Sequence, residues 1–112
     1  MRKSLLGKLK KRSEFLAAAQ TDLKYVTPAF ILQLHNRFSE ETARYGVTAS
    51  RKVGGAVKRN FAKRRLRSLI HQTFLEHVHP GTDYVFIARE KILTIPFSQL
   101  TQDLEKILKK FP

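Results

Sequence analysis

Hydrophobic and polar residues alternate along residues 29–35, and this period of two predicts a β-strand. Phe30, Leu32 and Leu34 share one face, and Ile31, Gln33 and His35 share the other. Residues 45–49 predict a second strand. Residues 83–88 are rich in β-branched and aromatic side chains and predict a third, buried strand. A further short strand can form beside the first two.

Three other segments have the apolar spacing of helices. Ser13 can cap a short first helix. Residues 56–78 predict a long central helix between a Gly-Gly turn and a Pro-Gly turn. Pro96 opens a last helix whose apolar stripe runs to Phe111. Helices mixed with strands predict a single α+β domain over residues 1–112, a small two-layer sandwich with helices packed on a mixed four-stranded sheet.

The central helix has two faces of opposite character on a wheel drawn at about 100° per residue. One arc holds the residues expected to face the core: Ala62, Leu66, Leu69, Ile70 and Thr73. The adjoining arc is polar and cationic: Asn60, Lys63, Arg64, Arg67 and His71. Arg59 lies at the seam, and Arg65 points to a third side. Side chains one turn apart repeat about every 6 Å along the axis, so the cationic arc can follow a nucleic-acid backbone.

Positive charge is concentrated in two segments of the chain. There are 22 basic and 9 acidic residues, a formal net charge of +13. Residues 1–12 hold six of the basic residues, residues 51–67 hold eight, and neither segment has an acidic residue. The rest of the chain therefore has eight basic against nine acidic residues. Concentrated like charge is self-repelling, and a polyanionic partner is the usual reason for it. A patch that only aids solubility is the alternative.

Other site chemistries have little support in the sequence. The chain has no cysteine for a disulfide or a thiolate ligand. Its four histidines lack metal-ligand spacing with a carboxylate, and its acidic residues form no two-metal cluster. The Gly54-Gly55 pair is not followed by the Lys-Ser or Lys-Thr pair of a Walker phosphate-binding loop. We therefore expect no catalytic residue, metal site or cofactor in the protein itself, and no small-molecule substrate.

Membrane and DNA binding are weaker alternatives for the basic helix. No apolar run approaches the roughly 20 residues of a membrane-spanning helix, and the amino-terminal segment lacks the pattern of a signal peptide. We expect a cytoplasmic protein that does not bind membranes, because the core takes up the apolar face of the helix. Sequence-specific DNA binding would need a helix-turn-helix pair, zinc ligands or a zipper, which the sequence lacks. An acidic protein partner stays open.

Residues 52–70, KVGGAVKRNFAKRRLRSLI, resemble the signature of the bacterial ribonuclease P protein subunit. The signature is met at Lys52, Gly54, Ala56, Val57, Arg59, Asn60, Lys63, Arg64 and Arg67. The segments KLKKRSEF, RYGVTASRK and DYVFIAR resemble three further parts of the family sequence. The resemblance therefore extends along the whole chain.

This resemblance implies a fold and a function. The implied fold is an α+β sandwich with a left-handed crossover, similar to one domain of a small-subunit ribosomal protein, although the general rule favours right-handed connections. The implied function is that of an accessory subunit in the ribonucleoprotein endoribonuclease that removes the 5′ leader from precursor tRNA. Its RNA subunit is the catalyst and holds the Mg²⁺ ions. The partners of the protein would be this catalytic RNA and the precursor tRNA.

The resemblance also implies two binding sites. The first contacts the catalytic RNA through Arg51, Lys52, Arg59, Asn60, Lys63, Arg64 and Arg67. The second is a cleft between the first helix and the sheet that holds the single-stranded leader, formed by Lys8, Lys10, Lys11, Arg12, Phe15 and Gln33. Phe15 is either a base-stacking platform or a core aromatic. Ala19 and Gln33 stand where the family often has aromatic residues, so stacking in this cleft should be weaker.

Two other functions stay open on the residues alone. A ribosomal or other structural RNA-binding protein with a related fold could carry the same basic helix. A free-standing nuclease would cleave RNA with protein groups and would need a carboxylate cluster, which the sequence does not show.

Overall fold

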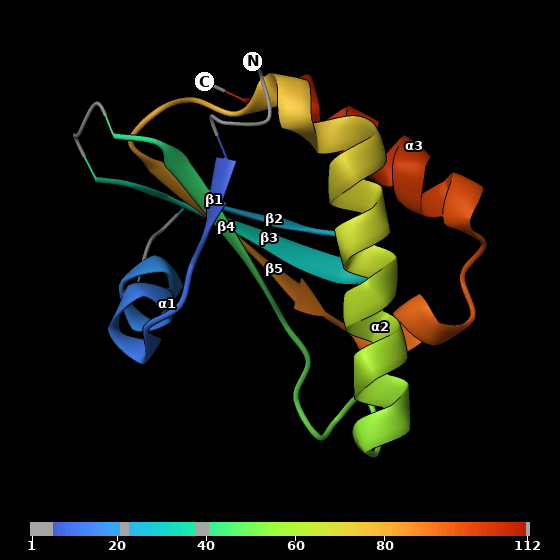
Figure 1. Ribbon diagram of the computed structural model, residues 1–112. Helices are drawn as coiled ribbons and strands as arrows, with labels where there is room; N and C mark the ends of the chain where they lie inside the picture. Colours follow the sequence, from blue (N-terminus) through green and yellow to red (C-terminus); the bar gives the residue numbers. More distant parts are fainter. Residues whose placement is uncertain (1–5, 21–22, 38–40, 112) are drawn as a thin grey trace.

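The computed structural model describes residues 6–20, 23–37 and 41–111 (Figure 1). The strands are β1 (Leu6–Lys8), β2 (Lys24–Val26), β3 (Phe30–Asn36), β4 (Ala43–Thr48) and β5 (Thr82–Ala88). The helices are α1 (Arg12–Ala19), α2 (Ala56–Leu69) and α3 (Phe97–Leu108). A π-helical turn, Ile70–Phe74, and a short 3₁₀ turn, Leu75–His77, continue α2, and a second 3₁₀ turn, Glu90–Leu93, follows β5.

The five strands form one mixed sheet in the order β1-β4-β5-β3-β2. Strand β4 runs parallel to both β1 and β5, whereas β3 runs antiparallel to β5 and β2. The predicted α+β class is confirmed, but the expected count of four strands is wrong. The further short strand is β2, and β1 is the strand that the sequence pattern did not reveal. Three residues are too few to show a period, and β1 exists because it pairs with β4, which is distant in sequence.

The helices cover the two faces of this sheet unequally. Helices α2 and α3 lie together on one face, and α1 lies on the opposite face (Figure 1). The predicted two-layer sandwich is therefore the sheet with α2 and α3, to which α1 adds a partial cover on the second face. Strands β4 and β5 are parallel neighbours joined through α2, and the left-handed crossover implied by the resemblance refers to this connection. Its handedness stays a prediction.

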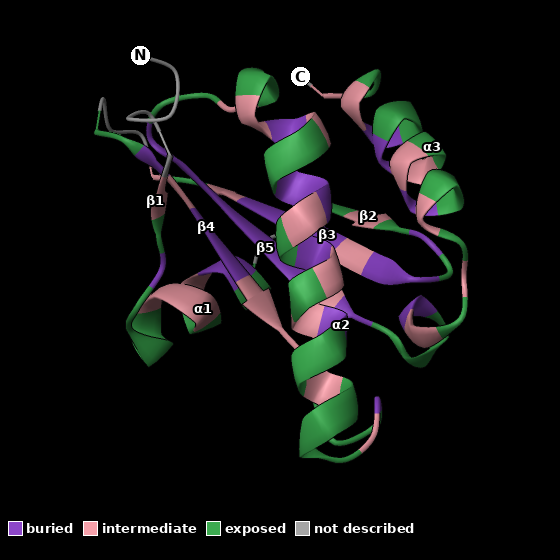
Figure 2. Cartoon of the chain, turned by 45° about the vertical axis from the view of Figure 1, so that its right-hand side comes forward, coloured by how far each residue is buried: buried purple, intermediate pink, exposed green. Residues whose placement is uncertain are grey.

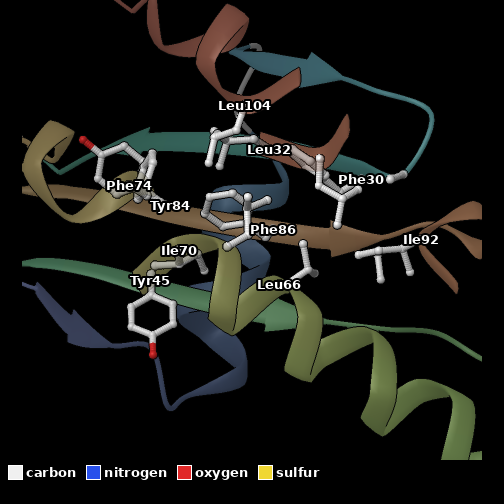
Figure 3. Close-up of a cluster of buried hydrophobic side chains, with 14 of the residues drawn as sticks. Phe30, Leu32, Tyr45, Leu66, Ile70, Phe74, Tyr84, Phe86, Ile92 and Leu104 are labelled. Atoms are coloured by element: carbon white, nitrogen blue, oxygen red, sulfur yellow. The ribbon is translucent and has the colours of Figure 1, made fainter. Parts of the chain in front are cut away.

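The main core lies between the sheet and the pair α2 and α3 (Figure 3). Leu66, Leu69 and Ile70 are fully buried there, as the helical wheel predicted. Thr73 is only half-buried, and Phe74 is fully buried instead. A regular α-helix would place Phe74 on the cationic side, and the wider π-helical turn rotates it towards the sheet.

Helix α1 begins two residues earlier than a cap at Ser13 would give, and Ser13 is not its cap. The helix starts at Arg12, so Ser13 lies inside the first turn. The carboxylate of Glu14 does the capping: its Oε1 accepts hydrogen bonds from the backbone N–H groups of Lys10 at 2.9 Å and Lys11 at 3.0 Å. These donors carry partial positive charge, and a carboxylate satisfies them better than a hydroxyl does.

Candidate RNA-binding surfaces

The amino-terminal half of α2 extends beyond the edge of the sheet and is largely exposed (Figure 2). Farther along the helix, Ala62, Leu66 and Leu69 anchor it to the core. The turn before α2 leads into this exposed half. Helix α2 is therefore a rigid element whose first turns are free to meet a large partner.

The seven residues predicted to contact RNA lie in the turn before α2 and along α2 itself. Arg51 and Lys52 are exposed in the turn before α2. The four residues on the outward side of the helix are Asn60, Lys63, Arg64 and Arg67. Lys63 is half-buried and the other three are exposed. Asn60 lies three or four residues from Lys63 and Arg64, and these two lie four and three residues from Arg67, so the four side chains are neighbours along one side of the helix.

Arg59, the seventh residue, also has a structural role. Its Nη1 donates a hydrogen bond to the carbonyl oxygen of Gly54 at 2.9 Å, which ties α2 to the turn before it. Gly54 has a φ of 144°, a conformation that favours glycine. A Cβ at this position would also lie 2.6 Å from Cδ of Lys58. The turn thus requires Gly54 and is held closed by Arg59.

Arg65 differs from its neighbour Arg64, in agreement with the helical wheel. Its guanidinium donates hydrogen bonds to the carbonyl oxygens of Ile92 at 3.0 Å and Ile95 at 2.7 Å. These bonds tie α2 to the segment that connects β5 with α3. Arg64 is exposed and is free of such a role in the described contacts. Two adjacent arginines therefore serve different purposes.

The second predicted site is a cleft of about 210 Å³ between α1 and the sheet. Its lining residues are Arg12, Phe15, Leu16, Ala19, Gln33, Thr48, Val85 and Ile87. Three of the six predicted leader-binding residues are among them. The other three, Lys8, Lys10 and Lys11, are exposed on the segment that leads into α1. Arg2 and Lys3, which belong to the same basic segment, lie outside the described residues.

Phe15 sits in this cleft because Gly46 in β4 leaves room for its ring. A Cβ at Gly46 would lie 2.5 Å from Cε1 and 2.6 Å from Cζ of Phe15. The ring also packs against a small second core of Leu9, Ala18 and Val85. Phe15 is half-buried, so it is both a packing residue and a wall of the cleft. The sequence analysis missed the role of Gly46, although a glycine inside a predicted strand is a signal of close approach.

An ion-pair network that the sequence analysis also missed anchors α1 beside the cleft. Arg44 donates from Nε to Oδ1 of Asp83 at 2.9 Å and from Nη2 to Oδ2 at 2.8 Å. Its Nη1 donates to Oε2 of Glu14 at 2.6 Å. Asp83 is only 1% exposed. The nearest signal in the sequence was an aspartate at the start of a strand predicted to be buried, since a buried carboxylate requires a partner.

These contacts lower the pKa of Glu14 and raise the pKa of Arg44, so both shifts favour the charged form. The backbone N–H groups of Lys11 and Lys10, together with Arg44, hold the pKa of Glu14 below its ordinary value of 4.5. The hydrogen bonds to Asp83 raise the pKa of Arg44. Glu14 and Arg44 are therefore both charged at neutral pH, and the ion pair that joins α1 to β4 is maintained there.

In residues 6–20, 23–37 and 41–111, no three or more His, Cys, Asp or Glu side chains gather in a way that could hold a metal ion. None of the described helices has the length and apolar character to cross a membrane.

Known proteins resemble the chain over almost its whole length. The profile of the Ribonuclease P family matches residues 6–112. The ribonuclease P protein component of Paramagnetospirillum magneticum is 42% identical over 109 residues, covering 94% of this chain and 82% of the relative. The solved RNase P protein of Staphylococcus aureus has a TM-score of 0.75 at 26% identity, covering 92% of this chain and 93% of that one. The RNase P protein from Thermotoga maritima, at 24% identity and a TM-score of 0.75, shares the fold.

Proposed function

The chain belongs to the ribonuclease P protein family, and we propose that it binds the catalytic RNA and the 5′ leader of precursor tRNA and so assists removal of the leader. In this proposal the RNA subunit performs the cleavage and holds the Mg²⁺ ions. The protein supplies binding surfaces and positive charge. Its site of action would be the cytoplasm.

The observation that carries the proposal is the row of exposed cationic residues on α2. Arg64 and Arg67 extend outward from a helix whose opposite side is fixed in the core. A rigid row of this kind can neutralise successive phosphates, and each neutralised phosphate releases condensed counterions. Arginine suits this role because its planar fork can bind a phosphate through two hydrogen bonds.

The cleft beside α1 supports the second part of the proposal. It has an aromatic wall at Phe15, a buried amide at Gln33 and a cationic rim at Arg12. An unpaired nucleotide offers groups that match all three: a base that stacks, base edges that form hydrogen bonds and a phosphate. Exposed Lys8, Lys10 and Lys11 would extend the rim along the leader.

The positive charge of the protein predicts how it assists the reaction. Catalytic RNA and precursor tRNA are both polyanions and repel each other, and Mg²⁺ or a basic protein can screen that repulsion. A protein of formal net charge +13 should therefore have its largest effect when Mg²⁺ is scarce.

Reconstitution tests the proposal directly. We expect the protein, mixed with ribonuclease P RNA, to accelerate cleavage of precursor tRNA at low Mg²⁺ and to have little effect at high Mg²⁺. The protein without RNA should not cleave, and cleavage by protein alone would favour a free-standing nuclease. RNA binding without any gain in processing would favour a structural RNA-binding protein and contradict the proposal.

A further inference from the structure

Two large apolar side chains on α2 are exposed beside the cationic row. Val57 is 82% exposed and Phe61 is 39% exposed. They are four residues apart, so they lie next to each other on the helix surface. Neither belongs to the hydrophobic core around Leu66 and Leu69. Exposed apolar side chains on an otherwise highly charged helix call for a partner with an apolar surface.

The ring of Phe61 is supported from within the protein. The guanidinium of Arg65 lies over the ring, 5.7 Å from its centroid. Arg65 is itself held by hydrogen bonds to the carbonyl oxygens of Ile92 and Ile95, and it also lies 5.9 Å from the centroid of Phe97. Phe61 is therefore a positioned aromatic ring with a free surface, and ordering it on binding costs little entropy.

The position of Phe61 relative to Arg64 suits a nucleotide. Residues three apart on a helix have Cβ atoms roughly 5–6 Å from each other. A phosphate bound by Arg64 would thus leave its own base, or a neighbouring base, within reach of the Phe61 ring. The family signature leaves position 61 open, so membership alone assigns no role to this ring.

We propose that Phe61, flanked by Val57, is a stacking platform for an unpaired base of the RNA bound along α2. This inference rests on the proposed function and adds a contact that does not depend on charge. An RNA base is the favoured occupant because cationic Lys58, Arg64 and Arg65 adjoin the ring. These residues would attract a polyanion and repel a second copy of the same surface.

Affinity for ribonuclease P RNA, measured across a range of salt concentrations, tests the platform. Phe61→Leu keeps an apolar side chain but removes the aromatic face, and we expect it to weaken binding at least about fivefold without changing the salt slope. Val26→Ser is the matched control, because Val26 is 64% exposed on β2, away from α2. That control should bind as the unaltered protein does. Thermal unfolding of both variants verifies that they are folded at the temperature of the binding assay.

A spectroscopic test identifies the occupant. The chain has no tryptophan, so Phe61→Trp introduces a single reporter. Ribonuclease P RNA should quench its fluorescence by stacking, and it should not quench the fluorescence of Val26→Trp.

The outcomes separate this inference from the proposed function. If the unaltered protein binds the RNA and Phe61→Leu binds it equally well, the stacking platform alone is overturned. If the unaltered protein does not bind the RNA, the proposed function is overturned as well. Loss of self-association, or of binding to anionic vesicles, in Phe61→Leu with unchanged RNA affinity would assign the ring to that other partner instead.

Discussion

Arg64 and Arg65 are adjacent and chemically identical, yet their surroundings differ. The guanidinium of Arg65 forms two hydrogen bonds to backbone carbonyls and lies over two aromatic rings, 5.7 Å from the Phe61 centroid and 5.9 Å from the Phe97 centroid. Arg64 extends into solvent on the side of α2 that carries Asn60 and Arg67. The position of each residue on the helix, rather than its chemistry, decides which guanidinium is exposed to solvent.

This difference predicts that two alanine substitutions affect different properties, one RNA affinity and the other stability. Arg64→Ala should weaken binding to ribonuclease P RNA and make its salt dependence shallower by roughly one unit, with little change in stability. Arg65→Ala should lower the free energy of unfolding by about 2 kcal/mol, because two hydrogen bonds are lost. Urea unfolding and salt-dependent binding of both variants check this. An unchanged slope for Arg64→Ala would show that Arg64 does not contact phosphate.

At the scale of elements, α1 depends on a few specific contacts for its place on the sheet. Its hydrophobic contact area is small, with Ala18 as its only buried residue. The ring of Phe15 fits over Gly46, and Glu14 joins α1 to Arg44 and through it to buried Asp83. Because the cleft lies beneath α1, contacts that position this helix also set the shape of the cleft.

A methyl group at Gly46 should therefore disturb α1. In Gly46→Ala the added Cβ would lie 2.5 Å from Phe15, so the ring must move, and we expect a loss of about 1–3 kcal/mol in unfolding free energy. Gly55→Ala is the control, because a Cβ there would meet no atom within 4 Å, and it should cost less than about 1 kcal/mol. Thermal unfolding of the two variants makes the comparison. Equal stability of both would show that the close approach at Gly46 is unimportant.

The anchoring of α1 by Glu14 should depend on pH. The pKa of Glu14 is lower in the folded protein than its ordinary value of 4.5, so its ionised form stabilises the fold above that value. This stabilisation is lost as the pH falls through the lowered pKa. Glu14→Gln should therefore be less stable than the unaltered protein near neutral pH, and the difference should vanish in strong acid. Urea unfolding over this pH range measures it, with Glu105→Gln on the exposed side of α3 as the control.

On the scale of the whole molecule, the two candidate RNA surfaces lie on different sides of the sheet. Helix α1, which borders the cleft, lies on one face of the sheet, and α2 packs on the other face (Figure 1). A protein arranged in this way could contact the catalytic RNA on one side and the leader on the other without competition between them. Sites without shared contacts usually contribute additively to free energy.

Separate surfaces predict separable defects in the reconstituted enzyme. Phe15→Ala should weaken binding of precursor tRNA about fivefold through lost stacking and leave binding of leaderless tRNA unchanged. Arg64→Ala should act on assembly with the catalytic RNA instead, and the two effects should add in the double variant. Titration of the assembled enzyme with each tRNA checks this. An equal loss for both tRNAs in Phe15→Ala would place Phe15 outside the leader site.

Local patterns in the sequence determined the α+β class and the buried and exposed sides of α2. The spacing of Leu66, Leu69 and Ile70 placed one side of α2 in the core, and the charges between them placed Arg64 and Arg67 outside. These features are readable because neighbours along a helix are also neighbours in sequence. The family signature lies in the same segment, and the resemblance implies the same α+β class that the pattern of predicted helices and strands indicates.

Only the tertiary structure decided the features that join distant segments. Strand β1 is defined by pairing with β4, and buried Asp83 forms ion pairs with Arg37 and Arg44, which are both remote along the chain. The π-helical turn buries Phe74 because of the shape of the core, and the regular helical period does not predict it. Such features arise from packing and from the need of buried charges for partners, which depend on how the whole chain folds.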